Sequence, residues 1–210
     1  MNRIKTAVFV SGGGTNLQAL IDAAGNGTVK SAELSLVISD NPDAYALQRA
    51  ERAGIKTEVV LKKNYSVRAE FEKEILAKLE ENKTELIVLA GFMCILSEEF
   101  TRKYERRIIN VHPSLIPAFC GEGFFGLRVH KAALGRGVKI TGATVHYVNE
   151  IADGGEIIMQ KAVSVEPGDT PEILQKRVMT QAEWIILPQA LEKVAAELLA
   201  KKTAEIEVIE

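Results

Sequence analysis

Cysteine, long apolar runs and an excess of charge of one sign are all scarce in this chain. Only Cys94 and Cys120 occur among its 210 residues, and neither belongs to a C-x-x-C pair or a close Cys/His cluster, so we expect reduced thiols and no metal site. The apolar runs, such as residues 86–90, are far shorter than the roughly 20 residues that span a bilayer. The N-terminus also lacks a signal-peptide pattern. We therefore expect a cytoplasmic protein that does not enter a membrane.

The charges are nearly balanced, with 26 basic and 28 acidic side chains and a net charge of -2. Binding to a nucleic-acid backbone depends on basic residues that replace counterions, so nucleic acid is not an expected partner. The length and the 47% hydrophobic content suit one compact domain with a sizeable core.

Apolar stretches alternate with amphipathic ones through the first half of the chain. The pattern predicts strands over residues 6–11, 34–39, 56–60, 86–90 and 107–111, and helices over 15–24, 44–53, 66–82 and 97–104. Strands that alternate with helices are typical of a parallel sheet covered on both faces. We therefore predict the α/β class, with a doubly wound, mainly parallel sheet.

The second half follows a different pattern. Residues 141–148 and 156–165 are separated by a glycine-containing turn rather than by a helix, which predicts an antiparallel C-terminal addition to the sheet. Residues 113–128 form a long loop rich in proline and glycine, and loops of that length are commonly functional or mobile. A helical segment over 170–202, broken or kinked at Pro188, and a frayed tail complete the prediction.

A glycine loop follows the first predicted strand. Gly12, Gly13 and Gly14 leave room for an anion to approach the free N–H groups of the next helix, so a phosphate site is one interpretation and a simple tight turn is the other. Thr15 and Gln18 match the S/T-x-x-E/Q capping box, so Thr15 could cap the helix, bind the phosphate or do both. Leu17 stands where the G-x-G-x-x-G/A dinucleotide fingerprint requires a small residue, and the NTP-binding G-x-x-x-x-G-K-[ST] motif is absent. Both nucleotide readings, including an NAD-dependent oxidoreductase, are therefore disfavoured.

Asn110 and His112 lie two residues apart at the end of a predicted strand, so their side chains project to the same side. Ligands of open α/β sheets bind at this carboxyl edge. An amide beside an imidazole can stabilise an oxyanion and transfer a proton, and Asp153 could orient His112 and favour its protonated form. The alternatives are that Asn110 and His112 satisfy backbone groups and that Asp153 only forms a turn. His130 and His146 are less persuasive, and three scattered histidines do not indicate a metal.

Two other features allow both a structural and a functional interpretation. Residues 86–96 could form one wall of a pocket for a flat heterocycle, or ordinary core. Glu183 precedes Trp184 on the predicted C-terminal helix, where a solvated face is the default expectation.

Five strings carry a resemblance to a known family: S-G-G-G-T-N from Ser11, L-A-G-F-M from Leu89, N-V-H-P-S-L-I-P from Asn110, G-A-T-V-H from Gly142 and D-G-G from Asp153. In this order they resemble the phosphoribosylglycinamide formyltransferases, the folate-dependent enzymes of de novo purine synthesis, over nearly the whole chain. The N-x-H-P-S-L-x-P string is shared with methionyl-tRNA formyltransferase and formyltetrahydrofolate deformylase, whereas the glycine loop and the single-domain length point to the glycinamide ribonucleotide group.

The resemblance implies transfer of a formyl group from 10-formyltetrahydrofolate, a co-substrate, to the amine of glycinamide ribonucleotide without a metal. It implies one formyltransferase domain over residues 1–203, with a phosphate-binding half (1–111), a catalytic and folate-binding half (112–203) and a tail (204–210). The partners would be these small molecules, and the protein a monomer or homodimer. The implied residues are Asn110, protonated His112 and Asp153 for catalysis; Gly13, Gly14, Thr15 and Asn16 for the phosphate; Glu183 for the ribonucleotide; and Arg68, Met93, Cys94, Ile95, Leu96, Asn149, Glu150, Ile151 and Ala152 for folate.

Two departures from the family pattern accompany this expectation. Cys94 stands where better-known members carry Arg, and the loop over residues 119–128 is longer than theirs. Formyltetrahydrofolate hydrolysis is a second hypothesis, although the deformylases carry a second His where this chain has Pro113. A non-catalytic phosphate-binding module that uses only the glycine loop is a third.

Overall fold

Seven strands form one mixed sheet in the order β3-β2-β1-β4-β5-β6-β7. The computed structural model describes residues 3–207. The strands are β1 (Ile4–Val10), β2 (Ala32–Ser39), β3 (Lys56–Val59), β4 (Leu86–Leu89), β5 (Ile108–His112), β6 (Ile140–Tyr147) and β7 (Ile157–Ser164). The first five pair in parallel, and β6 and β7 add to β5 as antiparallel strands. The predicted fold class is confirmed, including the antiparallel addition.

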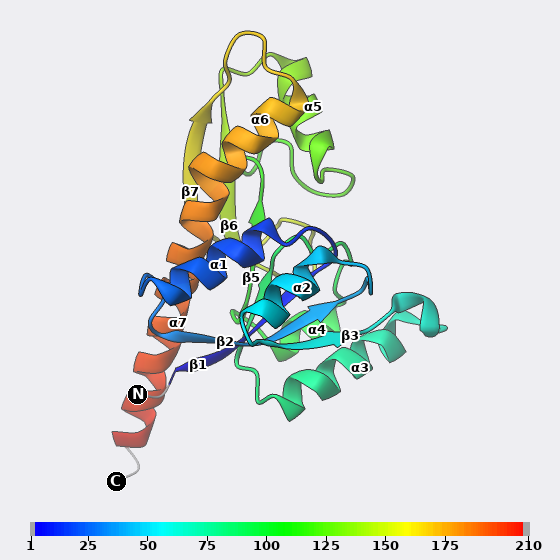
Figure 1. Cartoon of the computed structure of the whole chain (residues 1–210), viewed down its shortest axis with the longest axis vertical. Helices are drawn as coiled ribbons and strands as arrows, with labels where there is room; N and C mark the ends of the chain where they lie inside the picture. The colour runs from blue at the N-terminus through cyan, green and yellow to red at the C-terminus, as the bar shows by residue number, and fades with distance from the viewer. Residues whose placement is uncertain (1–2, 208–210) are drawn as a thin grey trace.

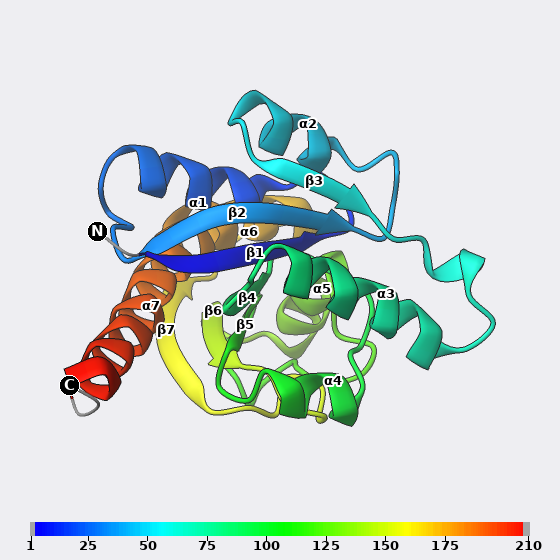
Figure 2. The same cartoon turned by 90° about the horizontal axis from the view of Figure 1, so that it is seen from below.

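The helices divide between the two faces of the sheet. They are α1 (Thr15–Gly25), α2 (Tyr45–Arg52), α3 (Arg68–Glu81), α4 (Glu98–Lys103), α5 (Leu127–Arg136), α6 (Pro171–Val178) and α7 (Trp184–Glu207), with a short 3-10 turn over Lys62–Asn64. Figures 1 and 2 show α1 and α7 on one face, and α3 and α4 on the other.

The side chains of β1 explain why two layers form. Val8 and Val10 belong to a core shared with α1, α2, α6 and α7, whereas Ala7 and Phe9 belong to a second core shared with α3 and α4. All four side chains are fully buried, which fits a central strand covered on both faces. Each core excludes water from one face of the sheet, so the loops at the ends of the strands are held by a rigid support.

The C-terminal helical segment differs from the prediction. The interruption is a π-helical turn over Met179–Glu183, between α6 and α7, whereas Pro188 lies inside α7. Pro188 therefore does not break the helix, and the predicted alternative, a kink at Pro188, stays a prediction. Residue 188 has no N–H to donate to the carbonyl of Trp184, which directly follows the π turn. Helix α7 also continues to Glu207, beyond the predicted start of a frayed tail near residue 202.

Candidate active site

Loops from three parallel strands meet at the carboxyl edge of the sheet. β1 lies between β2 and β4, so the chain winds from β1 outward to β2 and β3 on one side and then to β4 and β5 on the other, which creates the switch point at which ligands bind in α/β proteins. Ser11, which follows β1, donates its N–H to the carbonyl oxygen of Gly91 at 3.1 Å, and its hydroxyl accepts the N–H of Met93 at 2.9 Å. These two bonds tie the glycine loop to the loop that follows β4.

Asn110 lies near the end of β5, directly opposite His146 on the antiparallel strand β6. The Nδ2 atom of Asn110 is 3.2 Å from Nε2 of His146, and Nδ1 of His146 is 2.7 Å from the carbonyl oxygen of Tyr147. His146 is buried, whereas Asn110 is half-buried and borders a cavity. The amide of Asn110 is thus held from the protein side while it faces the cavity.

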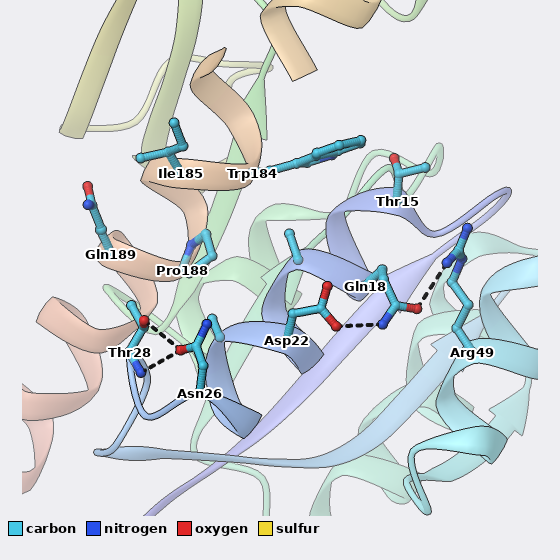
Figure 3. A pocket seen from close by; sticks show the side chains of 12 residues that line it. Thr15, Gln18, Asp22, Asn26, Thr28, Arg49, Trp184, Ile185, Pro188 and Gln189 are labelled. Atoms are coloured by element: carbon cyan, nitrogen blue, oxygen red, sulfur yellow. Dashed lines mark hydrogen bonds between the residues drawn. The ribbon is translucent and has the colours of Figure 1, made fainter. Parts of the chain in front are cut away.

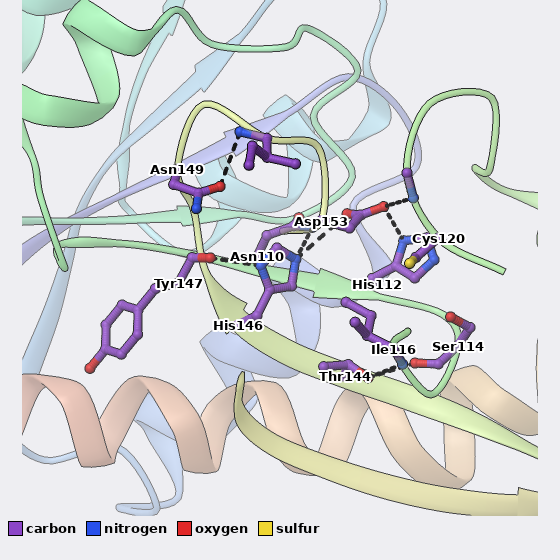
Figure 4. A network of polar contacts seen from close by, with 12 residues as sticks. Asn110, His112, Ser114, Ile116, Cys120, Thr144, His146, Tyr147, Asn149 and Asp153 are labelled. Carbon is purple, nitrogen blue, oxygen red and sulfur yellow. Dashed lines mark hydrogen bonds and ion pairs between the residues drawn. The ribbon is translucent and has the colours of Figure 1, made fainter. Parts of the chain in front are cut away.

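His112 and Asp153 meet as the sequence predicted, because the turn between β6 and β7 folds over the carboxyl edge (Figure 4). Nδ1 of His112 is 3.3 Å from Oδ2 of Asp153, and Nε2 of His112 is 2.9 Å from the carbonyl oxygen of Phe119. Asp153 also accepts the N–H of Gly121 at 2.9 Å. Both ring nitrogens of His112 therefore face protein oxygen atoms, and the carboxylate joins the hairpin to the loop after β5.

A glycine in the hairpin turn permits this close approach. A Cβ atom at Gly155 would lie 1.7 Å from the carbonyl oxygen of Tyr147, so no larger residue fits there. Asp153 itself has a φ of 55°, a left-handed conformation that Asp and Asn adopt more readily than most residues. The D-G-G string thus serves the shape of the turn as well as its chemistry.

Burial and the neighbouring charges shift the pKa values of His112 and Asp153 in opposite directions. Burial lowers the pKa of His112 below its ordinary 6.5, because the imidazolium loses water, while the carboxylate of Asp153 and the carbonyl of Phe119 partly oppose that shift. Burial would raise the pKa of Asp153, but the nearby imidazole rings and the N–H of Gly121 hold it below its ordinary 3.8. Asp153 is therefore a carboxylate, and the charge of His112 is sensitive to what enters the cavity.

The glycine loop ends at the N-terminus of α1. Gly14, with a φ of 69°, is the N-cap residue, and no side chain caps the helix. The predicted capping box was wrong, because α1 begins at Thr15 and the amide of Gln18 bonds Asp22 and Arg49 instead. Within residues 3–207, no hydrogen bond uses the N–H groups of Gly13, Gly14, Thr15 or Asn16. Free N–H groups at the positive end of a helix dipole suit an anion.

Glu183 contacts the first turn of the same helix through Asn16. Its carboxylate accepts the Nδ2 proton of Asn16 at 2.7 Å, and its residue is only 6% exposed, so the expectation of a solvated face was wrong. Burial raises the pKa of Glu183, with the bond from Asn16 opposing the shift. The π turn ends at Glu183, and such turns often occur at functional sites because the wide turn redirects a side chain.

One cavity of about 870 Å³ connects these groups. A volume of this size is typical of small-molecule sites. Its lining includes Asn110, His112 and Asp153 together with Thr15, Asn16, Met93, Ile95, Glu122, Phe124, Phe125, His130, Gln175, Met179 and Glu183. A smaller cavity of about 440 Å³ lies between α1 and α7 (Figure 3); it shares Thr15 but contains none of the Asn–His–Asp cluster.

Comparison with known proteins identifies the family. The sequence profile of the formyl transferase family matches residues 4–191 of this chain. The chain belongs to the formyl transferase family. Among its relatives, the phosphoribosylglycinamide formyltransferase of Haemophilus influenzae is 42% identical over 88% of this chain and 84% of that protein. The crystal structure of phosphoribosylglycinamide formyltransferase from Brucella melitensis has a TM-score of 0.84 and 44% identity, and the match covers 93% of this chain and 97% of that one.

Some relatives of this formyl transferase are much longer. The trifunctional purine biosynthetic protein adenosine-3 of Gallus gallus is 48% identical over 93% of this chain, but the match covers 19% of that protein. The chain thus spans less than a fifth of the trifunctional relatives.

The structure of this formyl transferase brings many, but not all, of the predicted site residues together. Thr15, Asn16, Met93, Ile95, Asn110, His112, Ala152, Asp153 and Glu183 line the larger cavity. The folate-site candidates outside its lining are Arg68, Cys94, Leu96, Asn149, Glu150 and Ile151. Leu96 packs in the core, Cys94 donates its thiol proton to Asp40, and Arg68 is exposed at the start of α3.

Four features of the site were not predicted from the sequence. His146 and the carbonyl of Phe119 contact the catalytic candidates, and Arg49 donates to the carbonyl of Gly13 at 2.9 Å beside the glycine loop. His130 lines the cavity, fully buried, and burial, with a smaller contribution from His112, lowers its pKa to about 4. Each depends on tertiary contacts that local sequence patterns do not specify, and only the antiparallel pairing of residues 141–148 offered a signal, through the position of His146 on that strand.

Proposed function

We propose that this formyl transferase moves the formyl group of 10-formyltetrahydrofolate to the amine of glycinamide ribonucleotide. The uncharged amine attacks the formyl carbon, the bond between that carbon and N10 of the folate breaks, and one proton passes from the amine to N10. The products are the formylated ribonucleotide and tetrahydrofolate. No electron donor or acceptor is needed, because the formyl carbon keeps its oxidation state.

The observation that carries this proposal is the position of Asn110, His112 and Asp153 on a cavity that also receives the N-terminus of α1. The cluster offers an amide donor, an imidazole and a carboxylate, which suit an acyl transfer with a charged tetrahedral intermediate. The unused N–H groups of α1 suit the phosphate of a nucleotide-like acceptor. Groups suited to acyl transfer and groups suited to an anion thus border the same cavity.

The contacts of His112 suggest how it acts. An imidazolium carries two N–H groups, and Asp153 accepts the one at Nδ1. We infer that the Nε2 proton, which faces Phe119 in this structure, turns to the formyl oxygen when negative charge develops there. Asn110 would donate a second hydrogen bond to the same oxygen. Burial lowers the pKa of His112, so the imidazolium forms most readily when the negative charge of that oxyanion lies beside it.

The lining residues suggest where the two substrates bind. Gly13, Gly14, Thr15 and Asn16 would hold the phosphate, and the buried carboxylate of Glu183, which contacts Asn16, would accept bonds from ribose hydroxyls. Met93, Ile95 and Ala152 would contact the folate, whose flat pterin suits the partly apolar wall. Arg68, Cys94, Leu96, Asn149, Glu150 and Ile151 stay predictions for the folate, because their side chains lie outside the cavity lining.

The remaining predictions concern metals, location and assembly. Within residues 3–207, no group of three His, Cys, Asp or Glu side chains has metal-binding geometry, and no helix is both long and apolar enough to cross a bilayer. Action in the cytoplasm, without nucleic acid, as a monomer or homodimer stays a prediction that fractionation and light scattering would test.

The proposal is tested by incubating the protein with 10-formyltetrahydrofolate, with and without glycinamide ribonucleotide. Tetrahydrofolate release is followed by absorbance and the formylated product by mass. We expect release only with the ribonucleotide, and its collapse in His112→Ala. Release without the ribonucleotide would indicate a hydrolase, and ligand binding without turnover in either arm would indicate a binding module.

A further inference from the structure

We propose that His146 is a positioning residue that fixes the amide of Asn110 for the reaction. It would accept one Nδ2 proton of Asn110 and leave the second free to point at the formyl oxygen. This role rests on the proposed formyl transfer. It assigns a function to a histidine that does not itself line the cavity and that contacts Asn110, which does.

The hydrogen bonds of His146 determine which nitrogen carries its proton. Nδ1 is 2.7 Å from the carbonyl oxygen of Tyr147, and because a carbonyl only accepts, Nδ1 must donate. In the neutral ring, Nε2 then has a free lone pair, which faces Nδ2 of Asn110 at 3.2 Å. Oδ1 of Asp153 is 3.6 Å from Nε2, beyond hydrogen-bond distance. The backbone carbonyl of Tyr147 thus determines the tautomer of His146, and that tautomer determines the orientation of the Asn110 amide.

This arrangement gives Asn110 only one favourable orientation. If the amide turned over, its oxygen would face the lone pair of Nε2, and two acceptors would meet. The observed orientation, in which the amide meets His146 (Figure 4), leaves the other Nδ2 proton of Asn110 without a partner among the described residues, and Asn110 borders the cavity. A donor that is already oriented costs no reorganisation when the oxyanion forms, which is the main source of its catalytic effect.

The backbone of β6 supports the same role. Asn110 and His146 are directly opposite in the antiparallel pair, and the register between β6 and β7 shifts between Val145 and His146. The residue that this shift leaves unpaired is Ile158 on β7, so β6 stays regular at His146 and its pairing with β5 fixes where the imidazole lies. His146 is 1% exposed, so packing holds the ring against Asn110.

Replacements that mimic each ring nitrogen separate this role from simple packing. A Gln side chain reaches the position of Nε2, and an Asn side chain reaches that of Nδ1. We expect His146→Gln to keep kcat within about 5-fold of the wild type. His146→Asn and His146→Leu should lower kcat by about 10- to 100-fold, less than deletion of an oxyanion donor, with both KM values within about 3-fold. Thr141→Val is the matched control, because Thr141 is buried on the same strand, about 16 Å away.

A double-mutant cycle tests whether His146 acts through Asn110. In the Asn110→Ala background, His146→Leu should lower kcat by less than about 3-fold further, because the group it positions is gone. Additive losses would overturn the proposal, and so would better rescue by His146→Asn than by His146→Gln, since that would make the bond to Tyr147 the important one. If the Leu variant does not fold, the Gln and Asn pair decides the question alone. Absence of ribonucleotide-dependent turnover in the wild type would instead remove the proposed function.

Discussion

Replacement of Asp153 by Asn tests the charge balance at the centre of the site. The change keeps the shape of the side chain, and Asn tolerates the positive φ of this position. The amide oxygen of Asn can still accept the N–H of Gly121, which lies 2.9 Å from Oδ2 of Asp153. The variant should therefore fold, while His112 loses the negative charge beside it.

The magnitude follows from the distance between the two side chains. Oδ2 of Asp153 is 3.3 Å from Nδ1 of His112, and their side chains are only 13% and 5% exposed. Two unit charges at this distance interact by about 5 kcal/mol at an effective dielectric constant of about 20. The Asn dipole recovers part of this, so about 4 kcal/mol of imidazolium stabilisation should be lost, or about 10³-fold in kcat. Both KM values should stay within about 3-fold, because the residues proposed to hold the two substrates do not change.

Steady-state kinetics and a pH series would measure the effect. With the carboxylate gone, burial acts on His112 with less opposition, and its pKa falls further below 6.5. Since the mechanism uses the imidazolium, the limb on which kcat falls with rising pH should move to lower pH in the variant. A loss of less than tenfold, or a move of that limb to higher pH, would refute the assigned roles of Asp153 and His112. Thermal melting would exclude unfolding as the cause.

Three further changes have defined outcomes. Asn110→Ala should lower kcat by about 10²–10³-fold with little change in KM, since it removes an oxyanion donor; equal kcat would contradict that role. Gly14→Ala should destabilise the fold by about 1–3 kcal/mol and raise the KM of the ribonucleotide, because the φ is 69° and the new Cβ would lie 2.6 Å from that of Ala46. Gly13→Ala, with nothing within 4 Å of the added Cβ, is the control for the loss of stability alone. Glu183→Gln should raise the KM of the ribonucleotide and also raise Tm at neutral pH by a few degrees, the effect of about 1 kcal/mol in a chain of this size. Burial raises the pKa of Glu183, so the protonated side chain stabilises the fold at acid pH, and this stabilisation is lost as the pH rises through the pKa of the folded state. The difference in Tm between Glu183→Gln and the wild type should therefore shrink towards acid pH. A difference that does not change with pH would contradict a buried charge on Glu183.

Local sequence patterns predicted most of the helices and strands and part of the Asn110–His112–Asp153 cluster. The two-residue period of a strand placed Asn110 and His112 on one side, and the alternation of strands and helices placed that side at a ligand-binding edge. The glycine turn predicted the hairpin that carries Asp153. These inferences depend on residues close in sequence, and the structure bears them out.

The features that the sequence did not predict depend on tertiary contacts. The register that places His146 opposite Asn110 joins segments 36 residues apart, and no local pattern specifies it. Glu183 looked solvated because charged helix residues usually are, but a π turn directs it to Asn16. Thr15 matched a capping pattern, yet the helix begins one residue after Gly14, whose left-handed conformation only the folded loop reveals.

Transfer of an isotopic label tests the central claim most directly. The formyl carbon of 10-formyltetrahydrofolate is labelled with ¹³C, and the fate of the label is followed by NMR and mass spectrometry in the presence of glycinamide ribonucleotide. The account predicts that the label appears on the amine of the ribonucleotide, at a rate that Asp153→Asn lowers by about 10³-fold. Label that appears in formate, or that stays on the folate while the ribonucleotide is bound, would contradict it.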